Sequence, residues 1–255
     1  MAARLELIAL EGLPLVEPGD DLVELLITGL SANSLALQEG DVLVIAQKIV
    51  SKAEGRYVRL ADVEPSERAT TLAAAAHKDP RLVELILRES REVMRVRPGV
   101  IIVEHRNGYV HANAGIDKSN ITHSPGDPRV LLLPRDPDAS ALALRQALAA
   151  RTGSAPQVII NDSAGRAWRN GTVGIAIGTA GLTPVRNQVG ERDLCGNVLE
   201  VTEPAEADEL AAAASLLMGQ GAEARPVVLA RGARLLRAEC GSGALLRDKS
   251  MDMFR

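Results

Sequence analysis

In the stretch from Gln157 to Gly178, oxygen-bearing side chains directly follow an apolar run. An apolar run from Val158 to Ile160 predicts a buried strand. Asn161, Asp162 and Ser163 follow this run directly. A carboxylate at the end of a hydrophobic strand is costly unless something pairs with it. A divalent cation is one such partner, because oxygen ligands suit Mg²⁺ or Mn²⁺.

Two arginines lie a few residues further on. Arg166 and Arg169 flank Trp168, the only tryptophan of the chain, and a second apolar run from Val173 to Ile177 follows. Planar guanidinium groups suit phosphate or carboxylate. The stretch therefore predicts a site for a metal and a phosphate-bearing anion. The alternative is a hairpin-like turn in which Arg and Asp pair at the surface, and for Arg169 a plain surface ion pair.

Further candidates for phosphate chemistry are spread along the chain. Oxygen-rich spots combine Asp117 with Asn120, and Gln220 with Glu223. Lys48 and Lys52 follow a predicted buried strand, where they embrace a polyphosphate or simply point into solvent. Carboxylates from distant segments together with lysines are what a two-metal phosphoryl-transfer site requires.

The histidines and cysteines carry less information. Neither residue type shows metal-ligand spacing or suggests a nucleophile pair, and we interpret each histidine as a surface or core residue: His77, His105, His111 and His123. The two cysteines, Cys195 and Cys240, are expected to be free thiols in a reducing cytoplasm.

Composition places the chain among ordinary globular proteins. It has 255 residues, 46% hydrophobic and 24% charged, enough for a sizeable core in one large domain or two small ones. A net charge of −4 and an aromatic content of 2% argue against nucleic-acid binding. No apolar run reaches the roughly 18 residues of a membrane span, and the N-terminus lacks signal-peptide features. We therefore expect a cytoplasmic protein.

The elements that must position these residues are about eight strands and about five helices in mixed order. This order favours an α+β fold with mixed sheets, in a single domain over residues 1–255 with a loosely ordered tail from about 240. Helices are expected over 20–30, 65–77, 79–89, 136–150 and 203–218. Strands are expected over 4–10, 42–46, 100–104, 109–111, 129–133, 158–160, 173–177, 198–202 and 226–230. A P-loop and a dinucleotide fingerprint are both absent, so a nucleotide site would be assembled from separate loops.

Five motifs, in order along the chain, resemble one known family, coenzyme F420-0:gamma-glutamyl ligase in its stand-alone form. They are EGLPLVEPGDDL, GDVLVIAQKIVSKAEGR, NAGIDKSN, NDSAGRAWRNGTVGIAIG and LLMGQGAE. The resemblance implies an α+β fold of two subdomains, a homodimer, GTP, two Mg²⁺ or Mn²⁺ ions, and K⁺. It also implies addition of L-glutamate to the lactyl-phosphate tail of the deazaflavin coenzyme F420-0, then of a second, gamma-linked glutamate. The flavin-binding reductase domain that some bacterial members carry is not expected.

Carried over residue by residue, the resemblance assigns roles to the motifs. Asp117 and Asp162 match the shared metal ligands, and Ser163 and Gln220 match ligands of a second metal. The nucleotide contacts that it implies are Leu13, Pro14, Leu15, Val16, Gln47, Lys48, Lys52, Asn120, Met218, Gly219, Gln220, Gly221, Ala222, Glu223, Ala224 and Arg225. Lys48, Lys52, Arg166 and Arg169 are the catalytic candidates, the two arginines for holding an anionic substrate.

This chain departs from the family at several of these positions. Ser163 stands where other members have Thr, and Gln220 stands where archaeal members have Glu. Gln47 and Lys48 replace a small polar pair. We therefore expect the second metal to be held weakly, with Gln220 as its ligand or, alternatively, as a helix cap and nucleotide contact.

The implied mechanism proceeds through an acyl phosphate made at the expense of GTP. Two alternatives remain: an amide ligase acting on another acidic acceptor, and a non-catalytic regulator that binds nucleotide and metal.

Overall fold

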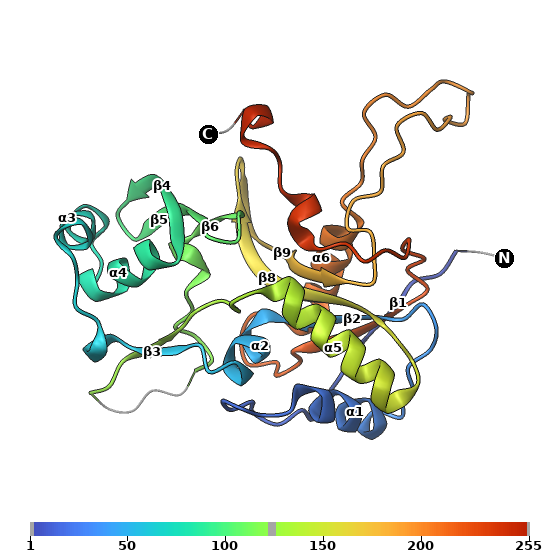
Figure 1. Cartoon of the computed structure of the whole chain (residues 1–255), viewed down its shortest axis with the longest axis horizontal. Coiled ribbons are helices and arrows are strands. Elements are labelled where there is room, and N and C mark those ends of the chain that lie inside the picture. The colour runs from blue at the N-terminus through green and yellow to red at the C-terminus, as the bar shows by residue number, and fades with distance from the viewer. Residues whose placement is uncertain (1–2, 122–125, 254–255) are drawn as a thin grey trace.

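The computed structural model describes residues 3–121 and 126–253. Helices and strands are mixed along the chain, so the predicted α+β class is confirmed (Figure 1). His123, one of the four histidines, lies outside the described residues.

A five-stranded sheet is the centre of the fold. Its strand order is β1-β10-β2-β8-β9, and β2 and β8 are its only parallel neighbours among the described residues. The parallel pair places the end of β2 beside Asn161 of β8, because Ala46 is paired with Asn161. The strands are β1 (Glu6–Ala9), β2 (Val42–Ala46), β8 (Gln157–Arg166), β9 (Arg169–Ala180) and β10 (Val227–Arg231).

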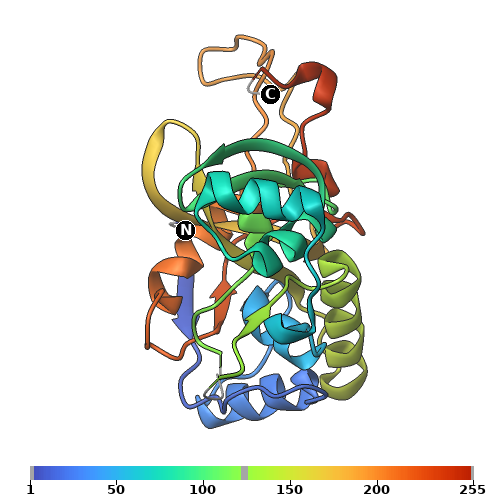
Figure 2. The same cartoon turned by 90° about the vertical axis from the view of Figure 1, so that its left-hand side faces the viewer.

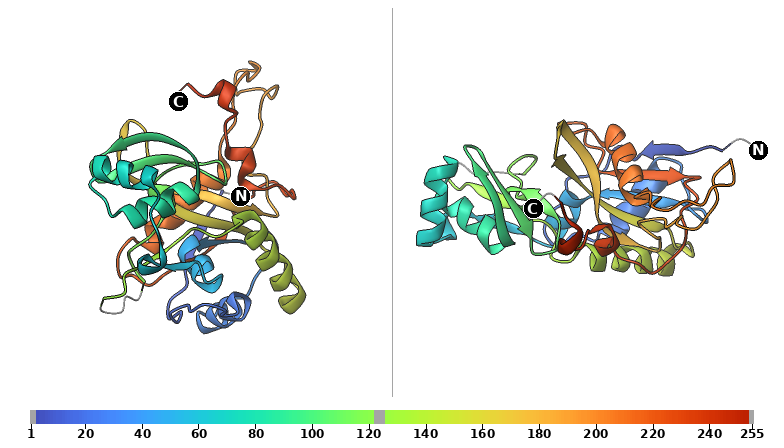
Figure 3. Two further views of the ribbon diagram at one scale, coloured as in Figure 1. Left: turned by 60° about the vertical axis from the view of Figure 1, so that its left-hand side comes forward. Right: turned by 90° about the horizontal axis from the view of Figure 1, so that it is seen from above.

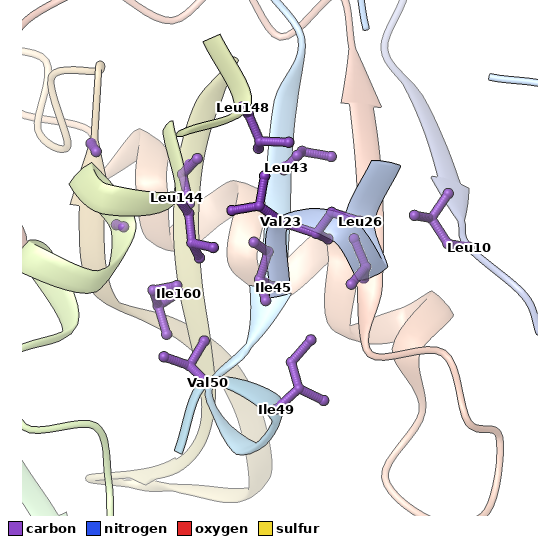
Figure 4. Close-up of a cluster of buried hydrophobic side chains, with 14 of the residues drawn as sticks. Leu10, Val23, Leu26, Leu43, Ile45, Ile49, Val50, Leu144, Leu148 and Ile160 are labelled. Carbon is purple, nitrogen blue, oxygen red and sulfur yellow. The ribbon is translucent and has the colours of Figure 1, made fainter. Parts of the chain in front are cut away.

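Helices cover both faces of this sheet because its central strands are apolar on both sides. Leu43 and Ile45 of β2 face α1 (Leu22–Ala32), α2 (Gln47–Ala53) and α5 (Pro137–Thr152), as Figure 4 shows. Val42 and Val44 face α6 (Glu206–Met218) on the other side. Seen from above, α5 and α6 lie on opposite sides of the sheet (Figure 3).

A second core lies beside the sheet. It is formed where α3 (Glu67–Ala76) and α4 (Pro80–Arg88) pack on a three-stranded antiparallel sheet (Figure 2). That sheet consists of β4 (Ser90–Arg97), β5 (Val100–His105) and β6 (Val110–Ala112). A short antiparallel pair, β3 (Tyr57–Arg59) and β7 (Arg129–Leu131), connects the two parts of the chain.

Most predicted elements are confirmed, including the hairpin of β5 and β6. The helix starts follow from capping, because Asp21, Ser66, Asp79 and Asp136 each accept a backbone N–H at the first turn. Three elements were not predicted: α2, β3 and β4.

The strand predicted over 198–202 is wrong. The segment lies in an extended arm, residues 183–205, which projects from the body (Figure 1). Its only bridge among the described residues joins Val198 to Arg192. Scattered backbone hydrogen bonds, such as Leu199 N–H to the Glu191 carbonyl (2.9 Å), join the two sides of the arm, but they do not form the continuous ladder of a strand.

The stretch around Asp162 also differs from prediction. The strand does not end at Ile160 but continues to Arg166, and β9 returns from Arg169, so Asp162 lies within a long hairpin. The described tail forms two 3₁₀ turns, Ser242–Leu245 and Lys249–Met251. None of the helices in the described ranges has the length and apolar character needed to cross a membrane.

Candidate active site

A pocket of about 540 Å³ opens where helix α2 after β2, the middle of β8 and the loop after α6 meet. Segments far apart in sequence line it, as expected for a site without a continuous nucleotide motif. The predicted residues among its lining are Leu13, Pro14, Leu15, Val16, Gln47, Lys48, Lys52, Asp117, Asn120, Asp162, Ser163, Met218, Gly219, Gln220, Gly221, Ala222, Ala224 and Arg225.

Helix α2 delivers three of these side chains at once. It starts directly after β2, so Gln47 is buried at its first turn, and Lys48 and Lys52 lie one turn apart on one face. The Ser51 hydroxyl donates to Gln47 Oε1 (2.9 Å), which fixes the amide. Burial and then the neighbouring Lys48 lower the pKa of Lys52. The pocket therefore contains crowded positive charge that an anion would relieve.

Two side chains from the first turn of α2 contact the carboxylate of Asp117. Gln47 Nε2 donates to its Oδ2 (2.7 Å), and Lys48 Nζ lies 2.9 Å from the same oxygen. The backbone of Asp117 is bridged to Leu131 of β7, which fixes where the carboxylate stands. Burial and then the charge of Asp162 raise the pKa of Asp117, and Lys48 opposes this rise. The two predicted metal ligands thus influence each other electrostatically.

Asp162 is held by a residue that sequence reasoning set aside. His111 of β6 is buried, and its Nε2 lies 3.0 Å from Asp162 Oδ2. Its Nδ1 lies 3.1 Å from the carbonyl oxygen of Ala112. Both partners are acceptors, so both ring nitrogens donate only in the doubly protonated form. Burial would lower the pKa of His111, but Asp162 outweighs it and raises that pKa.

The two neutral residues predicted for a second metal meet directly. Ser163 Oγ donates to Gln220 Oε1 (2.7 Å), so strand β8 and the loop after α6 are joined at this point. Asn120 Nδ2 donates to the carbonyl of Gly221 (3.0 Å) and joins the same loop to the segment of Asp117.

Glu223 supports this loop from within and is not among the pocket-lining residues. Its Oε2 accepts the backbone N–H of Gly221 (2.8 Å). Helix α6 ends at Met218, and its C-cap Gly219 has φ +71. This backbone angle favours glycine, and the Glu223 carboxylate lies in the space beside it.

Arg166 and Arg169 are not brought into the pocket. They pair across the end of the β8–β9 hairpin and are exposed there together with Trp168. Within the described part of the chain neither arginine forms an ion pair, so the surface ion pair considered for Arg169 is not observed.

The donors in the pocket fit a divalent ion shared with a ligand. Two carboxylates, a hydroxyl and amide oxygens converge, and Asn161 Oδ1 is a further buried oxygen without a partner among the described residues. However, no group of three His, Cys, Asp or Glu side chains converges in the described ranges. Mg²⁺ commonly uses one or two carboxylates plus phosphate oxygens and water rather than an all-protein cage, which matches this donor set.

Comparison with known proteins identifies the family of the chain. A family model described as F420-0:Gamma-glutamyl ligase matches residues 12–232. The chain belongs to this family. The predicted resemblance is thereby confirmed, and the matched range contains every residue of the pocket described above.

Named relatives cover nearly the whole chain. The coenzyme F420:L-glutamate ligase of Methanothermobacter thermautotrophicus is 48% identical over 253 residues, 98% of this chain and 99% of that protein. That of Methanopyrus kandleri is 48% identical over 244 residues, 94% of this chain and 93% of that protein. That of Archaeoglobus fulgidus is 41% identical over 252 residues, 99% of this chain and 97% of that protein.

Proposed function

We propose that this protein is a GTP-dependent ligase that joins L-glutamate to the carboxylate of coenzyme F420-0 and then adds a gamma-linked glutamate. Family membership and the names of the relatives support the ligase activity and the acceptor. One structural observation supports phosphoryl transfer: Asp117 and Asp162, from separate segments, share one pocket with Lys48 and Lys52.

The pocket would hold GTP between its loops. The N-terminal loop Leu13–Val16 and the loop after α6 both line the pocket and would contact the nucleotide, and Asn120 holds the second loop in place. Asp117 and Asp162 would hold a first Mg²⁺ or Mn²⁺, and Ser163 with Gln220 would hold a second more weakly. Such ions, when bound, neutralise charge on the phosphates and polarise the γ-phosphate.

The first reaction forms an acyl phosphate. A carboxylate oxygen of the acceptor attacks the γ-phosphorus of GTP, the bond to the β-phosphate oxygen breaks, and GDP leaves. Lys48 and Lys52 line the pocket. Their positive charges would stabilise the negative charge that develops on the transferring phosphoryl group. Lys48 forms an ion pair with Asp117 in this structure. If Asp117 held a divalent ion instead, the ammonium group of Lys48 would be available to bind phosphate.

The second reaction forms the amide. The glutamate amine attacks the acyl carbon, the carbon–oxygen bond to phosphate breaks, and inorganic phosphate leaves as the nitrogen loses a proton. The lowered pKa of the half-buried Lys52 favours its neutral form more than in water, but its neighbours in the pocket are those of a phosphate-binding lysine. We assign Lys52 to charge stabilisation and not to proton transfer.

The decisive assay combines purified protein, F420-0, GTP, glutamate and Mn²⁺, with products resolved by mass. We expect the coenzyme mass to rise by one and then two glutamyl residues, with one GDP formed for each. Omission of F420-0 is the control for idle GTP cleavage. Nucleotide and metal binding without coenzyme-dependent GTP cleavage would instead identify a regulator. Product formation only with a different acid would identify a ligase of another specificity.

A further inference from the structure

The end of the β8–β9 hairpin has features of a binding surface that the pocket does not use. Its turn, Arg166 to Arg169, projects past the body of the sheet, and Trp168 is 86% exposed. Tryptophan is highly buried on average, so one this exposed is unusual, and its flat ring can stack on another ring. The space beside Gly165 and Gly171 is open among the described residues.

The charge of this turn is not compensated. Arg166 and Arg169 are both exposed and form no ion pair within the described ranges, and Arg166 Nη1 donates only to the carbonyl oxygen of Gly171 (3.2 Å). An exposed aromatic side chain between two guanidinium groups that form no ion pair within the described ranges complements a ligand that carries both a flat ring and a phosphate.

The hairpin also fixes the distance between this turn and the reacting centre. Arg166 lies four residues after Asp162 along β8, so their Cα atoms are about 13 Å apart at ~3.3 Å per residue. The register of the hairpin changes between Gly165 and Arg166, so Arg166 belongs to the turn and pairs there with Arg169.

The proposed acceptor has matching dimensions. In F420-0 the reacting carboxylate belongs to a lactyl group, followed by a phosphodiester, a ribityl chain and the deazaflavin ring. Roughly ten bonds separate the carboxylate from the ring, which at ~1.2 Å per bond in an extended chain spans about 12 Å. With its carboxylate near Asp162, the ring is within reach of Trp168, and the phosphodiester, about three bonds or roughly 4 Å from the carboxylate, lies between Asp162 and the turn.

We propose that the hairpin turn is the acceptor subsite of this enzyme: Trp168 stacks on the deazaflavin ring, and Arg166 and Arg169 bind the phosphodiester. This inference rests on the proposed function, because it assumes that F420-0 is the acceptor. It gives the two predicted arginines a role in holding substrate at a distance from the chemistry, rather than in the phosphoryl transfer itself.

The backbone of Trp168 provides a variant that separates binding from folding. Trp168 has φ +65, a conformation that glycine adopts more readily than any residue with a side chain. Trp168→Gly should therefore keep or raise the melting temperature while removing the stacking surface. Trp168→Phe keeps an aromatic face and serves as the conservative variant.

The test measures binding of F420-0 and of GTP separately by equilibrium dialysis. Trp168→Gly should raise the Kd for F420-0 about tenfold or more, the usual effect of losing one stacked aromatic, with Trp168→Phe close to wild type and the Kd for GTP unchanged. 2-Phospholactate, which has the phosphate but lacks the ring, should bind wild type and Trp168→Gly equally. Arg166→Gln should weaken both ligands about tenfold, whereas Arg97→Gln, on an exposed arginine of β4, should weaken neither.

The outcomes separate the two proposals. If wild type ligates glutamate to F420-0 and Trp168→Gly and Arg166→Gln bind it as tightly as wild type, the subsite is wrong and the proposed function stands. If wild type neither binds nor uses F420-0, both fail. A change in molecular mass of Trp168→Gly by light scattering, with the Kd for F420-0 unchanged, would show that the turn contacts another copy of the chain and would overturn the subsite.

Discussion

His111 Nε2 lies 3.0 Å from Asp162 Oδ2, although the two residues are 51 positions apart in sequence. The second ring nitrogen of His111 faces the carbonyl of Ala112, and Tyr109 packs edge-on against the ring. These contacts hold the imidazole in one orientation, and its hydrogen bond in turn fixes the position of the Asp162 carboxylate. His111 is a positioning residue for a predicted metal ligand, not a residue that touches substrate.

We predict that His111→Leu weakens Mn²⁺ binding, because partners that orient a metal-ligating carboxylate typically contribute ten- to a hundredfold in affinity. His111→Gln, which retains an N–H donor, should lose less. Isothermal titration of Mn²⁺ in the presence of GTP measures this directly. A lower melting temperature with the Mn²⁺ affinity of wild type would mean that His111 only fills the core.

Asp162 itself should be indispensable for turnover. Asp162→Asn keeps the size of the side chain but replaces one acceptor oxygen with an amide donor and removes the charge that a divalent ion requires. We expect loss of most activity at a normal melting temperature, and weaker Mn²⁺ binding. Asp193→Asn, on the exposed arm, is the matched control. An Asp162→Asn enzyme with the rate and metal affinity of wild type would exclude the metal assignment.

A buried ion cluster should make the fold sensitive to acid. Glu89 Oε2 lies 2.9 Å from Arg56 Nη2 and 3.3 Å from Arg106 Nη2, with His105 Nε2 3.8 Å away. Burial alone would raise the pKa of Glu89, but the neighbouring His105 and the two arginine charges outweigh it and lower that pKa below the ordinary 4.5. The unfolded chain therefore takes up this proton first as the pH falls.

The contribution of Glu89 to the free energy of unfolding is thus complete above pH 4.5 and is lost as the pH falls through the folded-state pKa. Glu89→Gln should destabilise the protein by about 3–5 kcal/mol at neutral pH, because it leaves buried arginine charge uncompensated. It should also flatten the acid limb of the stability curve. Urea unfolding from pH 7 to pH 3.5 tests both effects, with the exposed Glu64→Gln as control. Parallel curves for wild type and Glu89→Gln would contradict the prediction.

The projecting arm suggests how two copies of the chain associate. Leu194 is fully exposed near its tip, and Val198 and Val201 are more than half exposed. Backbone bonds such as Gln188 N–H to the Thr202 carbonyl (3.0 Å) hold the two sides of the arm together. Projecting apolar residues on a held loop are typical of a subunit contact, and a closed two-fold dimer is the commonest assembly.

We therefore predict a homodimer in which the arm contacts the partner. A Leu194→Ser, Val201→Ser double variant should shift the mass seen by light scattering from twice 27.0 kDa towards 27.0 kDa at micromolar concentration. Leu216→Ser, on an equally exposed leucine of α6, should not. A wild-type protein that is monomeric in this experiment would rule out the dimer.

Prediction from sequence succeeded where the signal is local. The buried run Val42–Ala46 and the helix caps at Asp21 and Ser66 depend on neighbours within a few residues, so periodicity and capping reveal them. Strand β4 was missed because it is rich in charged residues and has few apolar ones. Its apolar residues Val93 and Val96 pack against the second core, a contact between segments that the local pattern does not reveal.

The site was predictable in its ligands but not in their partners. Asp117 and Asp162 follow from the motifs, whereas the roles of His111 and Glu223 depend on which segments the topology brings together. The spacing of residues in the sequence does not reveal that His111 of one sheet contacts Asp162 of another. The one available signal for His111 was its place on a hairpin strand next to the NAGIDKSN motif.

Gln220 is the position where this chain should differ most in its use of metal. Its Oε1 accepts the Ser163 hydroxyl (2.7 Å), so the two neutral ligands predicted for a second ion already form one polar pair. An amide oxygen binds a hard cation through a dipole rather than a full charge. The second ion should therefore bind weakly and enter largely as the metal–GTP complex, after the ion on Asp117 and Asp162.

Gln220→Glu should raise the affinity for the second ion, because it adds a negative charge beside a divalent cation, and Ser163 can still donate to the new carboxylate. The measurement is a Mn²⁺ titration of activity at fixed GTP, wild type against Gln220→Glu, with Glu223→Gln as a variant of the same loop that changes charge outside the pocket lining. We expect half-maximal activity at lower Mn²⁺ in Gln220→Glu alone. An unchanged Mn²⁺ dependence with an altered KM for GTP would identify Gln220 as a nucleotide contact, and the second metal would then have no protein ligand beyond Ser163 and the shared carboxylate.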